Sequence, residues 1–253
     1  MPYNSLMKRF ITAAAMLCVL TMFCRAAEIK VLASAGVRGP LSELARLFEA
    51  TSHQKLATDY EVTAVLKRRI DAGAPFDLTI LNPEIIDDLI RVGVIATETR
   101  TNFGRTGLAV AIRRGAFKPD ISSADTFKRT MLNARSVAHS KQGLSGVGFL
   151  AALTRLGIAE EMRPKLIAYD TDGSLPAVAR GEAELAVIAI GPILEVPDVE
   201  PVGMLPAEVQ TYVYFTAGVS TSAKELEAAR SFIRFISAPA AVPIIKSRGL
   251  EAF

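Results

Sequence analysis

Cysteine and histidine are nearly absent from this sequence, which limits the chemistry open to its side chains. The two cysteines, Cys18 and Cys24, both lie in the first 26 residues, a segment set aside below. The rest of the chain therefore has no disulfide, no thiol nucleophile and no thiolate metal ligand. Only two histidines occur, His53 and His139.

Neither sign of charge is in excess once that segment is removed. The full chain has 29 Lys and Arg against 26 Asp and Glu, and the loss of Lys8, Arg9 and Arg25 makes the two numbers equal. A balanced chain gives no electrostatic reason to bind nucleic acid or anionic lipid. We therefore expect no nucleic-acid partner.

Residues 1–26 are typical of a secretory signal peptide. Lys8 and Arg9 precede an uncharged run, residues 10–24, that is too short to span a bilayer comfortably. We expect cleavage near Ala26 and a soluble product exported to the periplasm. An uncleaved membrane anchor is the alternative, although the rest of the chain has no comparable apolar run.

After this segment, apolar strands alternate with amphipathic helices. Short apolar runs predict strands at about residues 29–32, 55–62, 76–81, 107–112, 136–138, 166–169, 185–190 and 212–219. Helical spacing predicts helices at about residues 40–50, 63–71, 83–92, 123–132, 147–156, 171–182, 222–236 and 240–246. This order predicts an α/β fold with mostly parallel sheets. Without a flexible linker, the two halves must be connected by strands.

Individual residues predict where several helices begin. Asn82 followed by Pro83 is a typical N-cap and first turn, and Ser222 with Glu225 has the capping-box spacing. Ser145 is interpreted as the N-cap of the helix after a glycine-rich loop. The predicted apolar face of that helix consists of Val147, Leu150, Leu153 and Leu156.

The first strand-to-helix junction, within residues 28–50, contains a small-residue loop. Small side chains let backbone N–H groups at a helix start approach a ligand closely, and the helix dipole favours an anion there. An ordinary connection is the alternative. Similar loops recur around Gly146 and Gly173, which favours the functional interpretation.

Motifs of catalysis find little support. GLSGVG around Ser145 resembles a nucleophile elbow, but Val147 stands where that motif needs glycine. His139 has no carboxylate partner at a suggestive spacing, and no HExxH, P-loop or GxGxxG motif occurs. We expect no enzyme activity, no metal and no cofactor, with a hydrolase that uses Ser145 and His139 as an alternative.

Binding is the class of function that the loops favour, because helix N-termini of two α/β lobes can meet at a cleft. The segments that carry a family resemblance are VLASAGVRGPLSELARLFEA (31–50), LKRRIDAGAPFDLTILNPEIIDDLIRVGVI (66–95), GVGFLAALTRLG (146–157), GSLPAVARGEAELAV (173–187) and FIRFISAPAAVPIIKSRGL (232–250). With them the chain resembles the periplasmic molybdate-binding proteins, the solute-binding components of bacterial ABC importers with a type II periplasmic binding protein fold.

This resemblance implies a two-lobed, hinged α/β fold with the ligand cleft between the lobes. One lobe would comprise residues 27–105 plus 215–253 and the other residues 106–214, with crossing strands near residues 107–112 and 212–219. A small anionic ligand, an ABC permease in the inner membrane as partner, and a monomeric protein are expected.

The resemblance also implies a site in which serine hydroxyls and backbone amides hold a tetrahedral oxyanion. By position, the family's contacts fall on Gly36, Thr63, Ser145, Thr171 and, for a tyrosine, Ala189 or Ile190. Gly36 and Ala189 have no hydroxyl group, and two lost donors lower the affinity for an anion by several powers of ten.

Other side chains near these loops are candidates to bind an anion in place of the absent hydroxyls. Ser34 is a candidate to replace the hydroxyl absent at Gly36, and Arg38 or Lys141 suits a carboxylate or phosphonate unless both are solvated rim residues. The predicted ligand-binding residues are Ser34, Gly36, Arg38, Thr63, Ser145 and Thr171.

The sequence thus predicts an exported solute-binding protein that captures a small anion for an ABC importer, with molybdate and tungstate as candidates. An organic carboxylate or phosphonate is the alternative ligand. A periplasmic sensor module is the alternative function.

Overall fold

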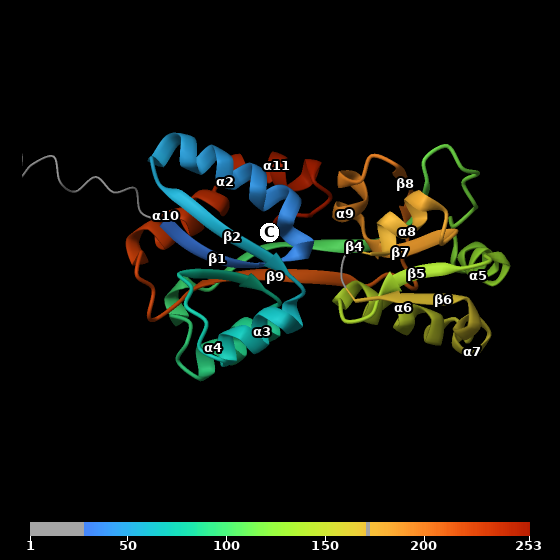
Figure 1. Ribbon diagram of the computed structural model, residues 1–253, viewed down its shortest axis with the longest axis horizontal. Helices are drawn as coiled ribbons and strands as arrows, with labels where there is room; N and C mark the ends of the chain where they lie inside the picture. The colour runs from blue at the N-terminus through green and yellow to red at the C-terminus, as the bar shows by residue number, and fades with distance from the viewer. Residues whose placement is uncertain (1–27, 171–172) are drawn as a thin grey trace, which may run out of the picture.

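The computed structural model describes residues 28–170 and 173–253 (Figure 1). The predicted signal peptide, its cleavage near Ala26, and the predicted contact Thr171 lie outside the described residues. The described strands are β1 (Glu28–Ser34), β2 (Lys55–Glu61), β3 (Leu78–Leu81), β4 (Thr101–Arg113), β5 (Val137–Ser140), β6 (Leu166–Tyr169), β7 (Leu185–Ala189), β8 (Val199–Met204) and β9 (Tyr212–Val219).

Helices connect most of these strands. The described α-helices are α2 (Arg38–Ser52), α3 (Thr63–Asp71), α4 (Pro83–Arg91), α5 (Ala124–Asn133), α6 (Leu144–Arg155), α7 (Ala159–Met162), α8 (Ser174–Arg180), α9 (Ile190–Glu195), α10 (Leu226–Ile236) and α11 (Val242–Ser247). Short 3-10 helices are η1 (Ala35–Val37), η2 (Thr97–Thr99), η3 (Arg163–Lys165) and η4 (Pro239–Ala241). The mixed α/β content agrees with the prediction.

The strands join in one continuous sheet in the order β2-β1-β3-β9-β4-β7-β5-β6, with β8 paired to β4. Within this sheet β1 is parallel to β2 and β3, and β5 is parallel to β6 and β7. The antiparallel pairs all involve β4 or β9. Each half is therefore parallel in its outer strands and antiparallel where the two long strands run through the middle.

Strand β4 divides the molecule into two lobes. Its first part, Thr101–Gly107, pairs with β9, and its second part, Leu108–Ile112, pairs with β7. We call the half with β1–β3, β9, α2–α4, α10 and α11 lobe 1, and the half with β5–β8 and α5–α9 lobe 2. Figure 1 shows helices on both faces of the sheet in each lobe. The residue boundaries expected from the sequence remain a prediction.

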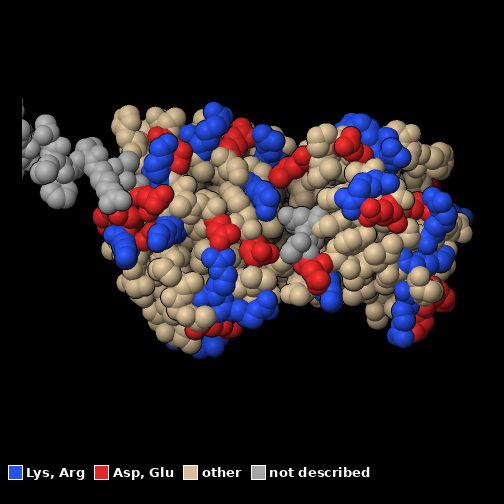
Figure 2. Space-filling view, viewed as in Figure 1, with Lys and Arg blue, Asp and Glu red and all other residues tan. Residues whose placement is uncertain are grey.

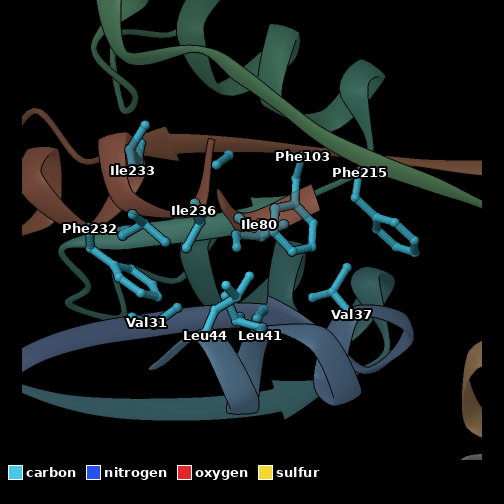
Figure 3. Packing of buried hydrophobic residues seen from close by; sticks show 14 of the residues in the cluster. Val31, Val37, Leu41, Leu44, Ile80, Phe103, Phe215, Phe232, Ile233 and Ile236 are labelled. Atoms are coloured by element: carbon cyan, nitrogen blue, oxygen red, sulfur yellow. The ribbon is translucent and has the colours of Figure 1, made fainter. Parts of the chain in front are cut away.

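Each lobe has its own hydrophobic core, because the central strands bury side chains on both faces. In lobe 1, Val31 of β1 packs in one cluster with Leu41 of α2 and Phe232 of α10, as Figure 3 shows. Leu32, on the opposite face of β1, packs instead with Leu66 of α3 and other residues of α3 and α4. This alternation of faces explains why the predicted apolar run is nearly continuous.

The same alternation builds lobe 2. Leu108 and Val110 of β4 belong to the cluster with α5, α6 and α7, whereas Ala109 and Ala111 belong to the cluster with α8 and α9. Small alanines face the side on which α8 and α9 lie close to the sheet. The two lobes therefore meet through β4 and β9 rather than through a shared core.

A buried carboxylate ties the parts of lobe 1 together. Asp77, just before β3, is 3% exposed, and its carboxylate accepts hydrogen bonds from the backbone N–H groups of Lys30 (2.8 Å), Lys224 (2.7 Å) and Glu225 (3.1 Å). These bonds link the edge of β3 to β1 and to the loop that enters α10. Through Asp77, the AGAPFDL segment (residues 72–78) holds β1, β3 and the loop before α10 together.

Two of the predicted helix starts are wrong. The N-cap position of α6 is Gly143, and Ser145 lies in the first turn without a capping role. Helix α10 begins at Leu226, and the Ser222 side chain pairs with the Ser220 hydroxyl at 3.0 Å instead of capping a helix. In the second case the Asp77 carboxylate from another element binds the loop N–H groups and displaces the local capping box.

The predicted apolar face of α6 is also partly wrong. Val147 and Leu150 are 57% and 40% exposed, whereas Phe149 and Leu153 are buried together with Gly146, Gly148 and Ala152. Helix α6 approaches the sheet through its glycines, which the apolar periodicity could not indicate. Strand β8 and helix α9 were not predicted, and β4 begins at Thr101 rather than near Gly107.

The surface carries both signs of charge. Figure 2 shows basic and acidic side chains interspersed over both lobes on the face that it presents. Among the described helices no single one is long and apolar enough to cross a membrane, although the bent pair formed by α10 and residues 239–247 passes that test by length and composition. Much of α10 is buried in the lobe 1 core.

Candidate functional site

A cavity of about 560 Å³ lies between the two lobes. Lobe 1 contributes the end of β1, η1 and the first turns of α2, α3 and α4. Lobe 2 contributes the loop before α6, the first turn of α8, the end of β7 and helix α9. Thr106, Val213 and Phe215 of the crossing strands form part of the wall. Elements distant in sequence therefore line one cavity between the lobes.

Strand direction explains this convergence. Ser34 ends β1, Thr63 follows β2 and Asn82 follows β3, so three parallel strands deliver their carboxyl ends to the same edge of the lobe 1 sheet. In lobe 2, Ser140 ends β5 and Ala189 ends β7 in the same way. Ligand sites of open α/β sheets lie outside such strand ends. The first turns of the helices that follow line the cavity, and helix N-termini favour anions.

Five of the six predicted ligand-binding residues line this cavity. They are Ser34, Gly36, Arg38, Thr63 and Ser145. Thr171 lies outside the described residues. The structure thus brings together residues that are more than 100 positions apart in the chain, whereas their direct contact with a ligand remains a prediction.

Three of these residues offer hydroxyl groups to the cavity. Ser34 and Thr63 are 8% and 7% exposed, and Ser145 is half-buried. Within the part of the chain that the structure describes, none of the three hydroxyls forms a hydrogen bond with the protein, yet all three remain accessible from the cavity. Hydroxyls in this state are ready to donate to an anion.

Arg38 brings a cationic group to the wall of the cavity. Its guanidinium carbon lies 5.3 Å from the centre of the Tyr60 ring, a cation–π distance. The Tyr60 hydroxyl is 2.9 Å from the Ser42 hydroxyl, and burial raises the pKa of Tyr60, so the phenol stays neutral. Lys141, the other candidate cation, is exposed, pairs with Asp170 at 3.3 Å and does not line the cavity.

Glutamates also line the cavity. Glu84 lies in the first turn of α4, and Glu195 ends α9. A Cβ atom at Gly39 would lie 2.1 Å from Glu195 Oε1, so this carboxylate from lobe 2 rests against the first turn of α2 in lobe 1. The anion-favouring end of α2 therefore faces a protein carboxylate as well as the cavity.

Gly36 has no hydroxyl because there is no room for one. A Cβ atom at this position would lie 2.7 Å from Phe215 Cζ, and Phe215 is 2% exposed. The phenyl ring of a crossing strand thus occupies the space that a serine side chain would need. The family tyrosine was expected to fall on Ala189 or Ile190, and Ala189 lines the cavity without a side-chain donor.

The hydrolase alternative gains no geometric support. His139 is 5% exposed, and its Nδ1 lies 3.0 Å from the Ser140 carbonyl oxygen, which can only accept a hydrogen bond. His139 does not line the cavity, and among the described residues no hydrogen bond joins it to Ser145. Its surroundings are those of a structural histidine.

Sequence reasoning missed several residues of the wall. Asn82 was interpreted only as a helix cap, and Thr106, Phe215 and Glu195 carried no motif. For Asn82 a signal existed, because it follows β3 just as Ser34 ends β1 and Thr63 follows β2. The position of the crossing strands and of α9 had no comparable local signal.

Comparison with known proteins places these features in context. The family model described as "Bacterial extracellular solute-binding protein" matches residues 29–251. Aconitate isomerase of a Pseudomonas species is 28% identical over 229 residues, covering 88% of this chain and 87% of that protein. The molybdate-binding protein ModA of Escherichia coli K12 is 25% identical over 227 residues, covering 88% of both chains.

A solved structure shares the fold. The periplasmic molybdate-binding protein of Azotobacter vinelandii superimposes with a TM-score of 0.75 at 21% identity, covering 88% of this chain and 98% of that one. The two-lobed periplasmic binding protein fold and the divergent likeness to molybdate-binding proteins, both predicted from the sequence, are thereby confirmed.

Proposed function

The chain belongs to the bacterial extracellular solute-binding protein family, and on that premise we propose that it captures a small organic carboxylate for an ABC importer. Membership implies an exported, periplasmic protein with a small ligand and a membrane permease as partner. Its likeness to molybdate-binding proteins supports an anion as ligand. The choice of a carboxylate over molybdate is the further step.

The single observation that carries this choice is the size of the cavity together with its largely apolar wall. Its volume of about 560 Å³ lies within the range of roughly 300–1,000 Å³ typical of sites for organic ligands. One metal centre with four oxygens needs far less space. The apolar side chains on its wall include Ile85, Leu144, Leu175, Ile188, Val213 and Phe215, which suit a carbon skeleton better than an oxyanion.

The polar groups of the wall suit carboxylate ends. The hydroxyls of Ser34, Thr63 and Ser145, together with helix N-termini, donate hydrogen bonds, and Arg38 supplies a planar cation. The donors missing at Gly36 and Ala189 weaken the case for a tetrahedral oxyanion. The Pseudomonas relative named for aconitate, a six-carbon tricarboxylate, supports the same class of ligand.

A ligand panel tests this proposal. The mature protein is screened by thermal shift, then by calorimetry, against molybdate, tungstate, sulfate, phosphonates and mono-, di- and tricarboxylates. A ligand at one hundred times its Kd adds about 2.7 kcal/mol of stability. Stabilisation by carboxylates but not by molybdate is expected. Micromolar binding of molybdate, with no response to any carboxylate, would overturn the proposal.

A second candidate function is isomerisation of an unsaturated carboxylate. The specific observation is the 28% identity to aconitate isomerase, combined with two carboxylates, Glu84 and Glu195, on the cavity wall that can take and return a proton. We favour binding without turnover, because the family to which the chain belongs is one of solute-binding proteins. Incubation with cis- or trans-aconitate in D₂O, followed by NMR, distinguishes the two, since an isomerase moves the double bond and exchanges a carbon-bound proton.

Export by a signal peptide cleaved near Ala26, and a monomeric state, belong to the same proposal. Lys8 and Arg9 followed by the uncharged run support the first. N-terminal sequencing of the protein isolated from its own periplasm and light scattering of the purified protein test them.

A further inference from the structure

We propose that the cavity selects ligands by charge, so that it takes a carboxylate with a single negative group and an apolar body and rejects dicarboxylates and tricarboxylates. The inference rests on the proposed function and names the ligand class within it. The charged side chains of the wall carry it. Among the described residues these are Arg38, Glu84 and Glu195, two carboxylates against one guanidinium.

Both carboxylates lie at helix starts that otherwise favour an anionic ligand. Glu84 is in the first turn of α4. Glu195 of lobe 2 lies against the first turn of α2, since a Cβ atom at Gly39 would be 2.1 Å from its Oε1. The positive ends of these two helix dipoles therefore already face protein carboxylates. A ligand carboxylate at either place meets a like charge.

Arg38 does not reverse this balance. Arg38 and Glu195 also line a neighbouring groove together, next to Gly39. Both lie close enough to Tyr60 to act on its phenol: burial is the main cause of its raised pKa, while Arg38 lowers and Glu195 raises that pKa. The guanidinium therefore brings hydrogen-bond donors to the wall, but the nearby carboxylate offsets its charge.

Helices α3 and α6 start at the wall without an acidic residue in their first turns. Thr63 opens α3 in lobe 1, and Ser145 lies in the first turn of α6 in lobe 2. One carboxylate between these two starts can accept hydrogen bonds from both lobes. The wall offers no second place of this kind with a cation beside it, so a second carboxylate on the ligand finds no counter-charge.

The rest of the wall suits an apolar body. It is largely apolar, with Ile188 of lobe 2 and Val213 and Phe215 of a crossing strand among its residues. The volume of about 560 Å³ leaves room well beyond one carboxylate. Each methylene group that is buried there should raise the affinity about fourfold.

The test compares ligands that share a six-carbon chain and differ only at its far end. Calorimetry measures the affinity of the wild-type protein for hexanoate, adipate and 6-aminohexanoate, which end in a methyl group, a carboxylate and an ammonium group. Hexanoate is expected to bind about tenfold or more tightly than adipate, because the second carboxylate meets the glutamates. It should also bind more tightly than 6-aminohexanoate, because the end of the chain lies against apolar side chains.

Two variants test the source of this preference. Glu84→Gln and Glu195→Gln keep the size of the side chain and remove its charge, so adipate should gain more affinity than hexanoate and the preference should fall about threefold in each. Both glutamates are exposed, so an increase from low salt to about 1 M salt should also reduce the preference in the wild-type protein.

A further variant and a control separate this selection from anchoring and from folding. Thr63→Val removes a hydroxyl that both ligands use, so it should weaken hexanoate and adipate alike. Glu208→Gln is the matched control, because it removes an exposed carboxylate that does not line the cavity. It should leave the preference unchanged. Melting curves without ligand check that every variant folds.

The outcomes separate the two levels of the proposal. If adipate or 6-aminohexanoate binds as tightly as hexanoate, or if neither glutamine variant narrows the preference, selection by charge is overturned and the carboxylate proposal stands. If no carboxylate binds, the proposed function fails and this inference fails with it.

Discussion

At the scale of single residues, Gly36, where the family resemblance led us to expect a hydroxyl contact, packs directly against the ring of Phe215. The backbone at Gly36 would accept a serine, but Phe215 from a crossing strand lies where the side chain would go. The glycine at position 36 and the Phe215 ring are therefore complementary in size, and a side chain at position 36 requires a change at Phe215. A residue that looks like a simple loss in the sequence is coupled to a core residue far along the chain.

A serine introduced by Gly36→Ser is therefore not expected to give the protein affinity for molybdate. The new Cβ would lie 2.7 Å from Phe215 Cζ, and such overpacking lowers the free energy of unfolding by about 1–3 kcal/mol. Urea denaturation and calorimetry with molybdate measure both effects. Combination with Phe215→Leu should recover part of the loss if the two residues are coupled. A fully stable Gly36→Ser protein that binds molybdate would contradict this explanation.

Asp77 allows a second prediction at the residue scale. Asp77→Asn replaces a carboxylate oxygen that accepts backbone N–H bonds by an amide donor, and should lower the free energy of unfolding by roughly 3 kcal/mol. Denaturant titration measures this change. Asp71→Asn, which alters only an exposed pair with Lys67, should change stability by less than about 0.5 kcal/mol. Equal losses of stability in the two variants would contradict a stabilising role of the hydrogen bonds that Asp77 accepts.

At the scale of elements, helix α6 shows how a glycine-rich loop can serve packing. A Cβ atom at Gly146 would lie 1.8 Å from the Ser140 carbonyl oxygen at the end of β5. The glycine lets the first turn of α6 lie directly against the strand end, where its N-terminus faces the cavity. Close approach, rather than capping by Ser145, sets the position of this helix.

Gly146→Ala should therefore affect both stability and binding. The new methyl group would clash with the Ser140 carbonyl oxygen, so the start of α6 must shift. This shift is expected to lower the free energy of unfolding by about 3 kcal/mol. It should also weaken ligand binding, because it displaces Ser145. Thermal denaturation and calorimetry measure the two effects. Gly203→Ala in β8 is the control, since its nearest neighbour, Ile121, would be at an ordinary 3.5 Å. A stable Gly146→Ala variant with unchanged affinity would refute the packing explanation.

At the scale of the whole molecule, the lobes are joined where β4 leaves β9 and begins to pair with β7. At this point the Gln210 amide replaces a strand partner, since its Oε1 accepts from Leu108 N–H at 2.8 Å and its Nε2 donates to the Leu108 carbonyl oxygen at 3.0 Å. A side chain can follow a change of angle between strands more easily than a backbone ladder can. This region is where we expect hinge motion.

Gln210→Ala tests the importance of this clamp. Removal of the amide takes away the acceptor of the Leu108 N–H, whereas the Leu108 carbonyl oxygen still accepts from the Leu205 N–H at 2.9 Å. The loss should cost about 1–3 kcal/mol and accelerate hydrogen exchange at Leu108. Hydrogen exchange followed by mass spectrometry or NMR measures the change. Exchange at Ile29 and Val31 of β1, in the lobe 1 core, is the internal reference. Unchanged protection of the Leu108 N–H against exchange would contradict a role of Gln210 at the hinge.

Closure of the lobes gives the last prediction. Ligand binding between the lobes should reduce the radius of gyration in small-angle scattering and slow exchange at the first turns of α2, α3 and α6, which line the cavity from both lobes. The cores of each lobe should show little change, since each is complete in itself. Binding without any change in scattering or exchange would contradict a hinged mechanism.

The sequence by itself determined the class of fold, most of the helices and strands, and five of the cavity residues. The helices and strands follow from short-range patterns, above all apolar periodicity. The five cavity residues were instead expected from the family resemblance and from their place in or beside the loops that it covers. Parallel strands bring their ends to one edge, so a residue that follows each strand is a sound candidate for the site.

Only the tertiary structure decided what surrounds each of these residues. The ring of Phe215 against Gly36, the amide of Asn82 turned toward Tyr214, and the carboxylate of Glu195 against Gly39 all join segments that are distant in sequence. No local pattern encodes such contacts, because they depend on how the crossing strands and α9 place the two lobes. The lining of the cavity follows from these long-range contacts, whereas an anion as ligand was already expected from the family resemblance of the sequence.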